Sequence, residues 1–296
     1  MDDGGGDPRG WLVFGLTGLV GECLRDAWRP DDPPLIAVSR HPQADAARLR
    51  WLAGALPDMA DPPFAPAAVV SLGPLDAFAA WFARSSLAPA RVVALGSTSV
   101  HAKAASPDAG ERAVAAALAA AESQLATACA ARGSELTVLR PTLIYGRGHD
   151  RNLSQLVAFA RRWRLLPLPR GARGLRQPVH ADDVAGAVLR ALRSPLPVPG
   201  HFDLPGGEAL PFDEMARRCL AVAAPAARVL SLPGPVFRLG ATLSGRSAAP
   251  GEGVLARLGQ DQAYDAGPLE AALGLRSRPF RPTAADLGGA AAPQQE

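Results

Sequence analysis

Ser97, His101 and Lys103 bring a hydroxyl, an imidazole and an amine within seven residues of one another. A serine hydroxyl can polarise a substrate oxygen, and histidine, with an ordinary pKa of about 6.5, can exchange protons at neutral pH. A lysine on the same loop would add positive charge. The alternative is that His101 is an ordinary polar loop residue and that Lys103 is solvated. The spacing predicts a candidate catalytic segment, with this alternative open.

Lysine and tyrosine are scarce in this chain of 296 residues. One of the 31 basic residues is a lysine, Lys103, and the two tyrosines are Tyr145 and Tyr264. A GC-rich coding bias accounts for much of the scarcity, because it also favours the Ala, Gly, Pro and Arg that are abundant here. It still restricts any mechanism that needs a tyrosine and a lysine at a fixed spacing. Tyr264 is assigned no role.

A glycine-rich loop, Gly15-x-x-Gly18-x-x-Gly21, directly follows the apolar run 11–14 and opens a helical pattern. In such a loop glycines allow positive φ and close approach to a pyrophosphate, and the helix amides and dipole hold the phosphates. This context predicts a dinucleotide site; the alternative is a strand–helix turn without a ligand. The predicted cofactor-binding residues are Gly15, Thr17, Gly18, Leu19, Val20, Gly21, Ser39, Arg40, Leu72, Gly73 and Pro141.

Ser39 and Arg40 end the second apolar run, about 20 residues after the loop, where the residue type selects the dinucleotide. An acidic side chain there would bind the ribose 2′-hydroxyl of NAD. A hydroxyl followed by a guanidinium suits a 2′-phosphate instead, which favours NADP over NAD. Because arginine is abundant in this chain, an ordinary solvated Arg40 is the alternative.

Short apolar runs alternate with helical patterns through most of the chain. This alternation predicts an α/β fold, a Rossmann-type doubly wound parallel sheet with a smaller C-terminal substrate-side region. The expected strands are 11–14, 35–38, a weaker one at 51–56, 68–72, 91–95, 136–139 and 201–204. The expected helices are 20–28, 75–84, 113–131, 152–163, 182–193 and 211–224. Asp182 or Asp183 is expected to cap its helix.

The predicted domain organisation is one Rossmann domain between two short tails. Residues 11–205 form the Rossmann domain, with 147–175 contributing to the substrate side, and 206–286 form a small, lid-like C-terminal substrate region. Residues 1–10 and 287–296 are small, polar and without periodicity, so both are predicted to be disordered tails.

Composition excludes several classes of function. A net charge of +3 is too weak to indicate binding to nucleic acid or to an anionic membrane. Cys23, Cys129 and Cys219 lack metal-ligand spacing and indicate buried thiols in a reducing compartment, with no metal site. No signal peptide is recognisable, and 113–131 is interrupted by polar residues before it reaches the roughly 18 apolar residues of a membrane span. We therefore expect a soluble, cytoplasmic protein.

Three further segments carry a family resemblance: 92–101 (VVALGSTSVH), 139–146 (LRPTLIYG) and 176–185 (RQPVHADDVA). Together with the glycine loop they are similar to the extended branch of the short-chain dehydrogenase/reductase superfamily, the NAD(P)-dependent epimerase/dehydratase-like proteins. The resemblance runs from about residue 11 to residue 204. It implies a bound dinucleotide and hydride transfer at a carbonyl or hydroxyl carbon.

The resemblance fails at the catalytic pair. The family carries Tyr-x-x-x-Lys in the helix after the fifth strand, and alignment on Glu122 places Val114 and Leu118 at these two positions. Neither side chain can transfer a proton or bind a ribose. No other alignment restores the pair, because Ser99 stands four residues before the only lysine. Ala55 also replaces an acidic residue that is common on the third strand.

The resemblance supplies candidate replacements for this pair. The catalytic candidates are Ser97, His101 and Tyr145. Tyr145 matches a residue that lines the site in the family, with packing as the alternative. Arg176 matches a position that contacts substrate phosphate, with an ion pair to Asp182 or Asp183 as the alternative. His180 is expected to be structural.

The leading hypothesis is an NAD(P)-binding, epimerase/dehydratase-like oxidoreductase of the atypical short-chain class. Its substrate would be a small molecule with a carbonyl or hydroxyl group, or a nucleotide-sugar-like compound. The alternative is a non-catalytic NADP-binding sensor or assembly subunit, and a scaffold without any ligand is a third reading. A homodimer is also open, because helices that flank the sheet often pair in this superfamily.

Overall fold

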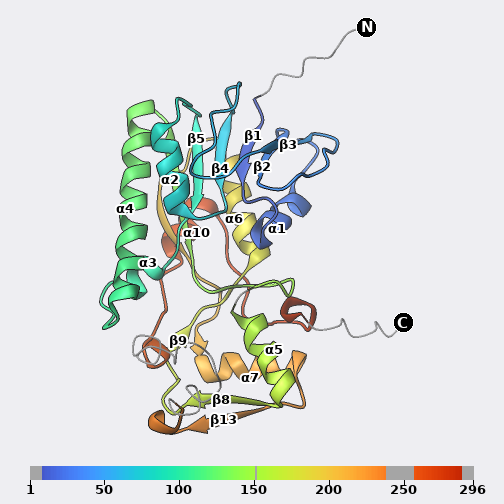
Figure 1. The fold of residues 1–296 in the computed structure, drawn as a ribbon, viewed down its shortest axis with the longest axis vertical. Helices are drawn as coiled ribbons and strands as arrows, with labels where there is room; N and C mark the ends of the chain where they lie inside the picture. Colours follow the sequence, from blue (N-terminus) through green and yellow to red (C-terminus); the bar gives the residue numbers. More distant parts are fainter. Residues whose placement is uncertain (1–8, 151, 238–256, 289–296) are drawn as a thin grey trace.

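The computed structural model describes residues 9–150, 152–237 and 257–288. At its centre is a seven-stranded sheet in the order β11-β6-β5-β4-β1-β2-β3, and every pairing in it is parallel (Figure 1). Its strands are β1 (Trp11–Phe14), β2 (Leu35–Ser39), β3 (Leu49–Ala53), β4 (Ala68–Ser71), β5 (Arg91–Leu95), β6 (Glu135–Pro141) and β11 (Gly200–Leu204). The strand order reverses beside β1, which is where doubly wound sheets bind ligands. The predicted Rossmann fold is confirmed.

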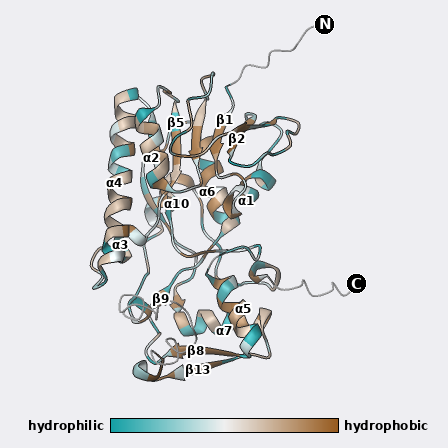
Figure 2. Ribbon diagram, viewed as in Figure 1, coloured by the Kyte–Doolittle hydropathy of each residue, from teal (hydrophilic) through white to brown (hydrophobic). Residues whose placement is uncertain are grey.

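Helices cover both faces of this sheet. Along β1, Trp11 and Val13 face α1 (Leu19–Ala27) and α6 (Ala181–Arg193), whereas Leu12 and Phe14 face α2 (Leu75–Arg84) and α4 (Ala109–Arg132). Alternate residues of a strand point to opposite faces, so a strand covered on both sides is apolar throughout. The central strands are accordingly the most hydrophobic part of the Rossmann domain (Figure 2).

Among the described helices, α4 alone is long and apolar enough to cross a membrane by length and composition. The expectation that no such stretch occurs here is therefore corrected. Its apolar character comes mostly from alanine, and Ala121, Leu125 and Ala128 are buried in the core shared with α2 and the sheet. This packing makes α4 a flanking helix of the Rossmann domain.

A smaller lobe lies below the sheet in Figure 1 and has a core of its own. Its elements, with the short strands that lead into it, are β7 (Ile144–Tyr145), α5 (Leu153–Trp163), β8 (Leu165–Pro169), β9 (Leu175–Arg176), β10 (Val179–His180), β12 (Leu210–Pro211), α7 (Phe212–Ala223) and β13 (Arg228–Leu232). Three two-stranded pairs are formed, β7–β10 and β8–β13 in parallel and β9–β12 antiparallel. Neither β8 nor β13 was expected from the sequence.

The C-terminal segment contributes to both cores. Helix α10 (Gly267–Leu273) buries Leu269 and Leu273 in the core between the sheet and α6, whereas η1 (Ala285–Leu287) buries Leu287 in the lobe. The region expected at 206–286 is thus shared between the Rossmann domain and the lobe. Residues 238–256, within the expected lid-like region, lie outside the described residues.

The two predicted tails lie largely outside the described residues, at 1–8 and 289–296. Inside them, Gly10 and Leu287 are buried, and the N–H of Ala67 donates to the carbonyl of Gly10. The packed chain therefore starts by Gly10 and continues through Leu287, slightly beyond the predicted bounds.

Two local predictions have different outcomes. Asp182 and Asp183 were the expected N-caps of α6, but the N-cap is His180. Its Nδ1 accepts a hydrogen bond from the N–H of Asp182 at 3.1 Å. Strand β10 ends at His180, so the helix begins one residue earlier than expected. All three cysteines are free and buried, as predicted.

Candidate active site

The glycine loop between β1 and α1 has the backbone that its spacing predicts. Gly15 has φ +85°, a conformation that L side chains rarely adopt. A Cβ at Gly21 would lie 2.4 Å from the carbonyl oxygen of Gly15, so only glycine lets α1 pack this closely on the loop. A Cβ at Gly18 would meet only that same oxygen, at 3.3 Å. Of the three glycines of the loop, Gly18 is therefore the one whose backbone a ligand can approach.

The start of α1 and the end of β4 form a cradle beside this loop. The first helical hydrogen bond runs from Glu22 N–H to the carbonyl of Gly18, which leaves the amides of the preceding turn without helical acceptors. Across from them, Leu72 donates to the carbonyl of Phe14, and a Cβ at Gly73 would meet nothing within 4 Å. Open space next to unpaired amides at a helix N-terminus fits a pyrophosphate.

Ser39 and Arg40 lie at the carboxyl end of β2, as predicted. The hydroxyl of Ser39 donates to the carbonyl of His41 at 2.8 Å and accepts from its N–H at 3.2 Å, so it belongs to a local turn. Arg40 is exposed, and among the described residues it has no hydrogen bond or ion pair. The guanidinium is therefore available for an anionic ligand, while the Ser39 hydroxyl is already engaged.

The segment after β5 turns directly into the short helix α3 (Ser99–Ala102). Half-buried Ser97 accepts from Ser99 N–H with its Oγ at 3.1 Å. Thr98 is buried and donates from N–H to the carbonyl of Pro141 at 3.2 Å, which joins the ends of β5 and β6. The predicted serine thus stands at the carboxyl edge of the sheet on a fixed turn.

His101 on α3 has an acidic partner that sequence reasoning missed. Its Nε2 lies 3.2 Å from Oδ1 of Asp203 and 3.4 Å from Nη1 of Arg140. Asp203 stands opposite Arg140 in the register of β11 and β6, so the sheet itself places both groups. An acidic residue within the strand segment HFDL was the available signal. Nδ1 of His101 has no partner among the described residues.

A buried ion pair lies next to His101. Arg140 donates from Nε to Oε1 of Glu122 at 2.9 Å and makes a second bond through Nη2, and Glu122 is only 5% exposed. Hydrogen bonding to Glu122 raises the pKa of Arg140 above its usual range. This pair fixes α4 to β6 and keeps a permanent positive charge close to the imidazole.

Tyr145, a predicted catalytic residue, lies in the core of the lobe. It is 1% exposed, and its ring packs edge-on against His180 and Phe280 with centroid distances of 5.0 Å. Burial raises the pKa of its phenol. The ring thus packs as the alternative expected, and a catalytic role for Tyr145 stays a prediction.

Arg176 is buried and holds main-chain carbonyls. Its guanidinium donates to Leu175 at 2.7 Å, to Gln260 at 2.8 Å and to Arg257 at 2.5 Å. Burial lowers its pKa. The expected ion pair with Asp182 or Asp183 is not formed in the described part of the chain. A contact with substrate phosphate remains a prediction, and it would compete with these carbonyl bonds.

Tyr264, to which no role was assigned, lies beside the predicted catalytic segment. Its ring centroid is 6.0 Å from that of His101, and its hydroxyl is 3.5 Å from the carbonyl oxygen of Thr98. Burial together with the charge of Arg257 lowers the pKa of Lys103. In the described residues Lys103 makes no hydrogen bond or ion pair with Ser97 or His101. A phenol thus stands where the lysine was expected.

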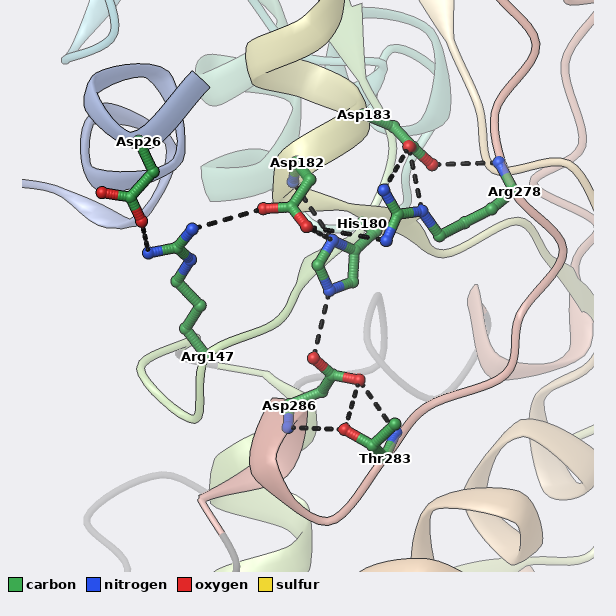
Figure 3. A network of polar contacts seen from close by, with 8 residues as sticks. All are labelled: Asp26, Arg147, His180, Asp182, Asp183, Arg278, Thr283 and Asp286. Atoms are coloured by element: carbon green, nitrogen blue, oxygen red, sulfur yellow. Dashed lines mark hydrogen bonds and ion pairs between the residues drawn. The ribbon is translucent and has the colours of Figure 1, made fainter. Parts of the chain in front are cut away.

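A polar network joins the Rossmann domain, the lobe and the C-terminal segment (Figure 3). Arg147 binds Asp26 of α1 at 2.6 Å and Asp182 of α6 at 3.5 Å. From the other side, His180 lies 3.1 Å from Asp286, as expected of a structural histidine. The remaining members are Asp183, Arg278 and Thr283, with Arg278 bound to Asp183 at 2.9 Å and Thr283 to Asp286 at 2.8 Å.

Comparison with known proteins supports the resemblance. Residues 70–204 match the NAD dependent epimerase/dehydratase family. Over this segment the chain is similar to that family. A search of curated proteins finds no match to the sequence. The matched segment contains the β5 and β6 motifs and ends at the last residue of β11.

Solved structures of the superfamily share the fold over nearly the whole chain. MoeE5 in complex with UDP-glucuronic acid and NAD superposes with a TM-score of 0.68 and 18% identity, covering 96% of this chain and 97% of that one. UDP-N-acetylglucosamine 4-epimerase from Bacillus cereus gives a TM-score of 0.63 and 14% identity, covering 94% and 93%. TunA, an NAD dependent NDP-hexosamine 5,6-dehydratase, gives 0.60 and 19%, covering 84% and 96%. None of these comparisons supports the sensor or assembly role.

The two positions that align with the Tyr/Lys pair of the epimerase/dehydratase-like proteins lie on α4. Val114, at the aligned tyrosine position, is 43% exposed, and Leu118 is partly buried in the core beside α2. Neither offers a proton or a hydrogen-bond donor at the edge of the sheet. Glu122, on which the alignment rests, is occupied by Arg140. The chain thus has the glycine-loop cradle and Ser97, but neither a tyrosine nor a lysine at these two positions of α4.

Proposed function

We propose that this chain is a dinucleotide-dependent, epimerase/dehydratase-like oxidoreductase acting on a small molecule. The observation that carries the proposal is the loop at Gly15, Gly18 and Gly21, where positive φ, close helix packing and open amides coincide at the switch point of the sheet. A bound dinucleotide supplies a reversible hydride acceptor at that edge. The residues in contact with the dinucleotide would be the cofactor-binding residues predicted from the sequence. They include Leu72, directly after β4, and Pro141, at the end of β6.

NADP is the dinucleotide that the end of β2 favours. Arg40 is exposed and has no partner among the described residues, so a 2′-phosphate could pair with it without displacing another contact. Ser39 takes part mainly by shaping the turn, because its hydroxyl already binds His41. MoeE5 and TunA are NAD proteins by their descriptions, so this preference would set the chain apart from these two neighbours.

The substrate class that fits best is a nucleotide sugar or a similar alcohol or ketone. The structural neighbours include proteins with UDP-glucose or UDP-glucuronic acid bound. This chain has a separate lobe beyond the carboxyl edge of its sheet. At that edge the Ser97 hydroxyl would polarise the reacting oxygen, and His101, paired with Asp203, would carry the proton.

Two broader properties belong to the same proposal. Three free, buried thiols suit a reducing compartment, which favours the cytoplasm. Pairing of flanking helices into a homodimer stays a prediction. Size-exclusion chromatography with light scattering would test it.

Thermal unfolding with and without dinucleotide tests the function. At about 100 times the Kd, a ligand that binds only the folded chain adds about 2.7 kcal/mol of stability, so NADPH should raise Tm by several degrees and NADH by less. Turnover is then measured with UDP-glucose, UDP-glucuronic acid and simple aldehydes and ketones. A Tm that neither NADPH nor NADH changes would overturn the proposal.

A further inference from the structure

Tyr264 is a phenol held at the reacting edge of the sheet by a segment far away in sequence. Its hydroxyl lies 3.5 Å from the carbonyl oxygen of Thr98, next to Ser97. That distance exceeds the roughly 3.0 Å limit of a well-formed O–H···O bond, and the same carbonyl already accepts from the N–H groups of His101 and Ala102 at 3.0 Å each. The half-buried hydroxyl is thus positioned without being strongly bonded, so it can bind another oxygen.

The chain that carries Tyr264 is fixed along residues 174–177. Gly174 donates to the carbonyl of Leu258 at 3.0 Å, and Gln262 donates to the carbonyl of Leu175 at 2.9 Å. A Cβ at Gly174 would lie 2.2 Å from the carbonyl oxygen of Gln260, so a side chain there is excluded. The N–H of Tyr264 itself donates to Oε1 of Gln177 at 2.6 Å.

Arg176 strengthens the same attachment. Its guanidinium binds the carbonyls of Arg257 and Gln260. Arg176 also lies over the ring of Phe212, with its guanidinium carbon 5.7 Å from the centroid. The superfamily position that was expected to bind substrate phosphate therefore positions the segment that ends at Tyr264.

Charged groups surround the phenol. Burial raises the pKa of Tyr264, the contact with Thr98 and the charge of Arg176 act against this rise, and the charge of Asp203 adds to it. The ring of His101 lies 6.0 Å from that of Tyr264, centroid to centroid, and its side chain is 45% exposed. The phenol therefore holds its proton at neutral pH, next to a titratable group that reaches water.

We propose that Tyr264 is the proton donor and acceptor for the reacting substrate oxygen, in place of the tyrosine missing from α4. This inference rests on the proposed function. In the reducing direction, reduced nicotinamide would supply a hydride with its electron pair to the carbonyl carbon, and the Tyr264 O–H would give its proton to the carbonyl oxygen. The C=O bond becomes an alcohol C–O bond, and His101 returns a proton from solvent to the phenolate. Oxidation runs through the same steps in reverse.

The scarcity of tyrosine makes a direct spectroscopic test available. In Tyr145→Phe the only phenol is Tyr264, so the ultraviolet absorbance of tyrosinate reports its titration alone. NADP⁺ carries a positive nicotinamide ring that should shift this titration to lower pH, whereas NADPH should not. If Tyr145→Phe does not fold, the difference between wild type and Tyr264→Phe gives the same titration curve.

Turnover provides the second test. Tyr264→Phe removes one hydroxyl and should lower kcat on the best nucleotide sugar by about 100-fold or more while the Kd for NADPH changes less than about 3-fold. Failure of both dinucleotides to bind would overturn the proposed function and this inference with it. If NADPH binds but the titration of Tyr264 is insensitive to NADP⁺, or Tyr264→Phe retains full turnover, the assignment of Tyr264 alone is overturned.

Discussion

At the end of β5, a serine, an imidazole and a carboxylate come from three separate elements. Ser97 follows the strand, His101 lies on α3, and Asp203 reaches the imidazole from β11 at 3.2 Å. A carboxylate at Nε2 fixes the orientation of the ring. The imidazole can then shuttle a proton through Nδ1, which has no partner among the described residues.

Substitution of this pair should affect rate more than binding. We expect His101→Ala to lower kcat by about 100-fold and Asp203→Asn by about 10-fold, because proton transfer by a positioned group contributes factors of this order. Steady-state kinetics would measure kcat, and fluorescence titration would measure the Kd for NADPH. Asp31→Asn, in an exposed loop, is the control that should leave both unchanged. Full activity in His101→Ala would remove the imidazole from the mechanism.

A separate prediction is that Arg40 determines the preference for NADPH over NADH. Arg40→Asp should weaken NADPH binding by about 10- to 100-fold, because a charge-assisted hydrogen bond is replaced by a repulsion, and should leave NADH binding within about 3-fold. Isothermal titration would measure both affinities. Arg50→Asp, on the neighbouring strand β3, is the matched control, since Arg50 is also exposed. Equal losses for both dinucleotides would refute the preference for NADP.

At the scale of elements, local sequence patterns predicted the strands and the glycine loop. The apolar runs gave the strands of the central sheet, and the glycine spacing gave the loop, because both depend on residues close in sequence. Strand β3 begins two residues before the prediction, since it is an edge strand with only Leu49 fully buried. The positions of Asp203 and Tyr264 at the site could not be predicted from the sequence. That of Asp203 depends on the register between β6 and β11, and that of Tyr264 depends on a distant segment that is hydrogen-bonded along residues 174–177.

Two glycine substitutions test how tightly the glycine loop packs against α1. Gly21→Ala would place a methyl 2.4 Å from the carbonyl oxygen of Gly15, which should cost about 1–3 kcal/mol in unfolding free energy and weaken NADPH binding. Gly186→Ala, inside α6, meets only a Leu275 methyl at 3.6 Å and should stabilise the chain by up to about 1 kcal/mol. Urea unfolding would measure both changes. A similar stability for the two variants would contradict the packing role of Gly21.

At the scale of the whole molecule, the C-terminal segment connects the two cores. It passes the site at Tyr264, joins the Rossmann core through α10 and reaches the lobe at η1. Beside η1, His180 and Asp286 link the start of α6 to this segment in the network of Figure 3. The geometry between cradle and lobe therefore depends on polar contacts as well as on packing.

Asp286 should make this connection sensitive to acid. Although burial alone would raise its pKa, hydrogen bonds from His180 and Thr283 hold the pKa of Asp286 at about 2, below the ordinary 3.8. A carboxyl with a lowered pKa in the folded chain contributes its stability fully above the unfolded value and loses it as the pH falls through the folded one. The difference corresponds to about 2 kcal/mol, present at neutral pH and lost between about pH 4 and pH 2.

Asp286→Asn tests this dependence. The variant should be about 2 kcal/mol less stable than wild type at neutral pH, and the gap should shrink as the pH falls below about 4, because the wild-type carboxylate then takes up a proton and loses its bonds. Urea unfolding at a series of pH values would measure the gap. Asp58→Asn is the control, since that side chain is 89% exposed and lies 3.7 Å from Arg84. A gap that stays constant down to the lowest pH would show that the stability of the connection does not depend on ionised Asp286.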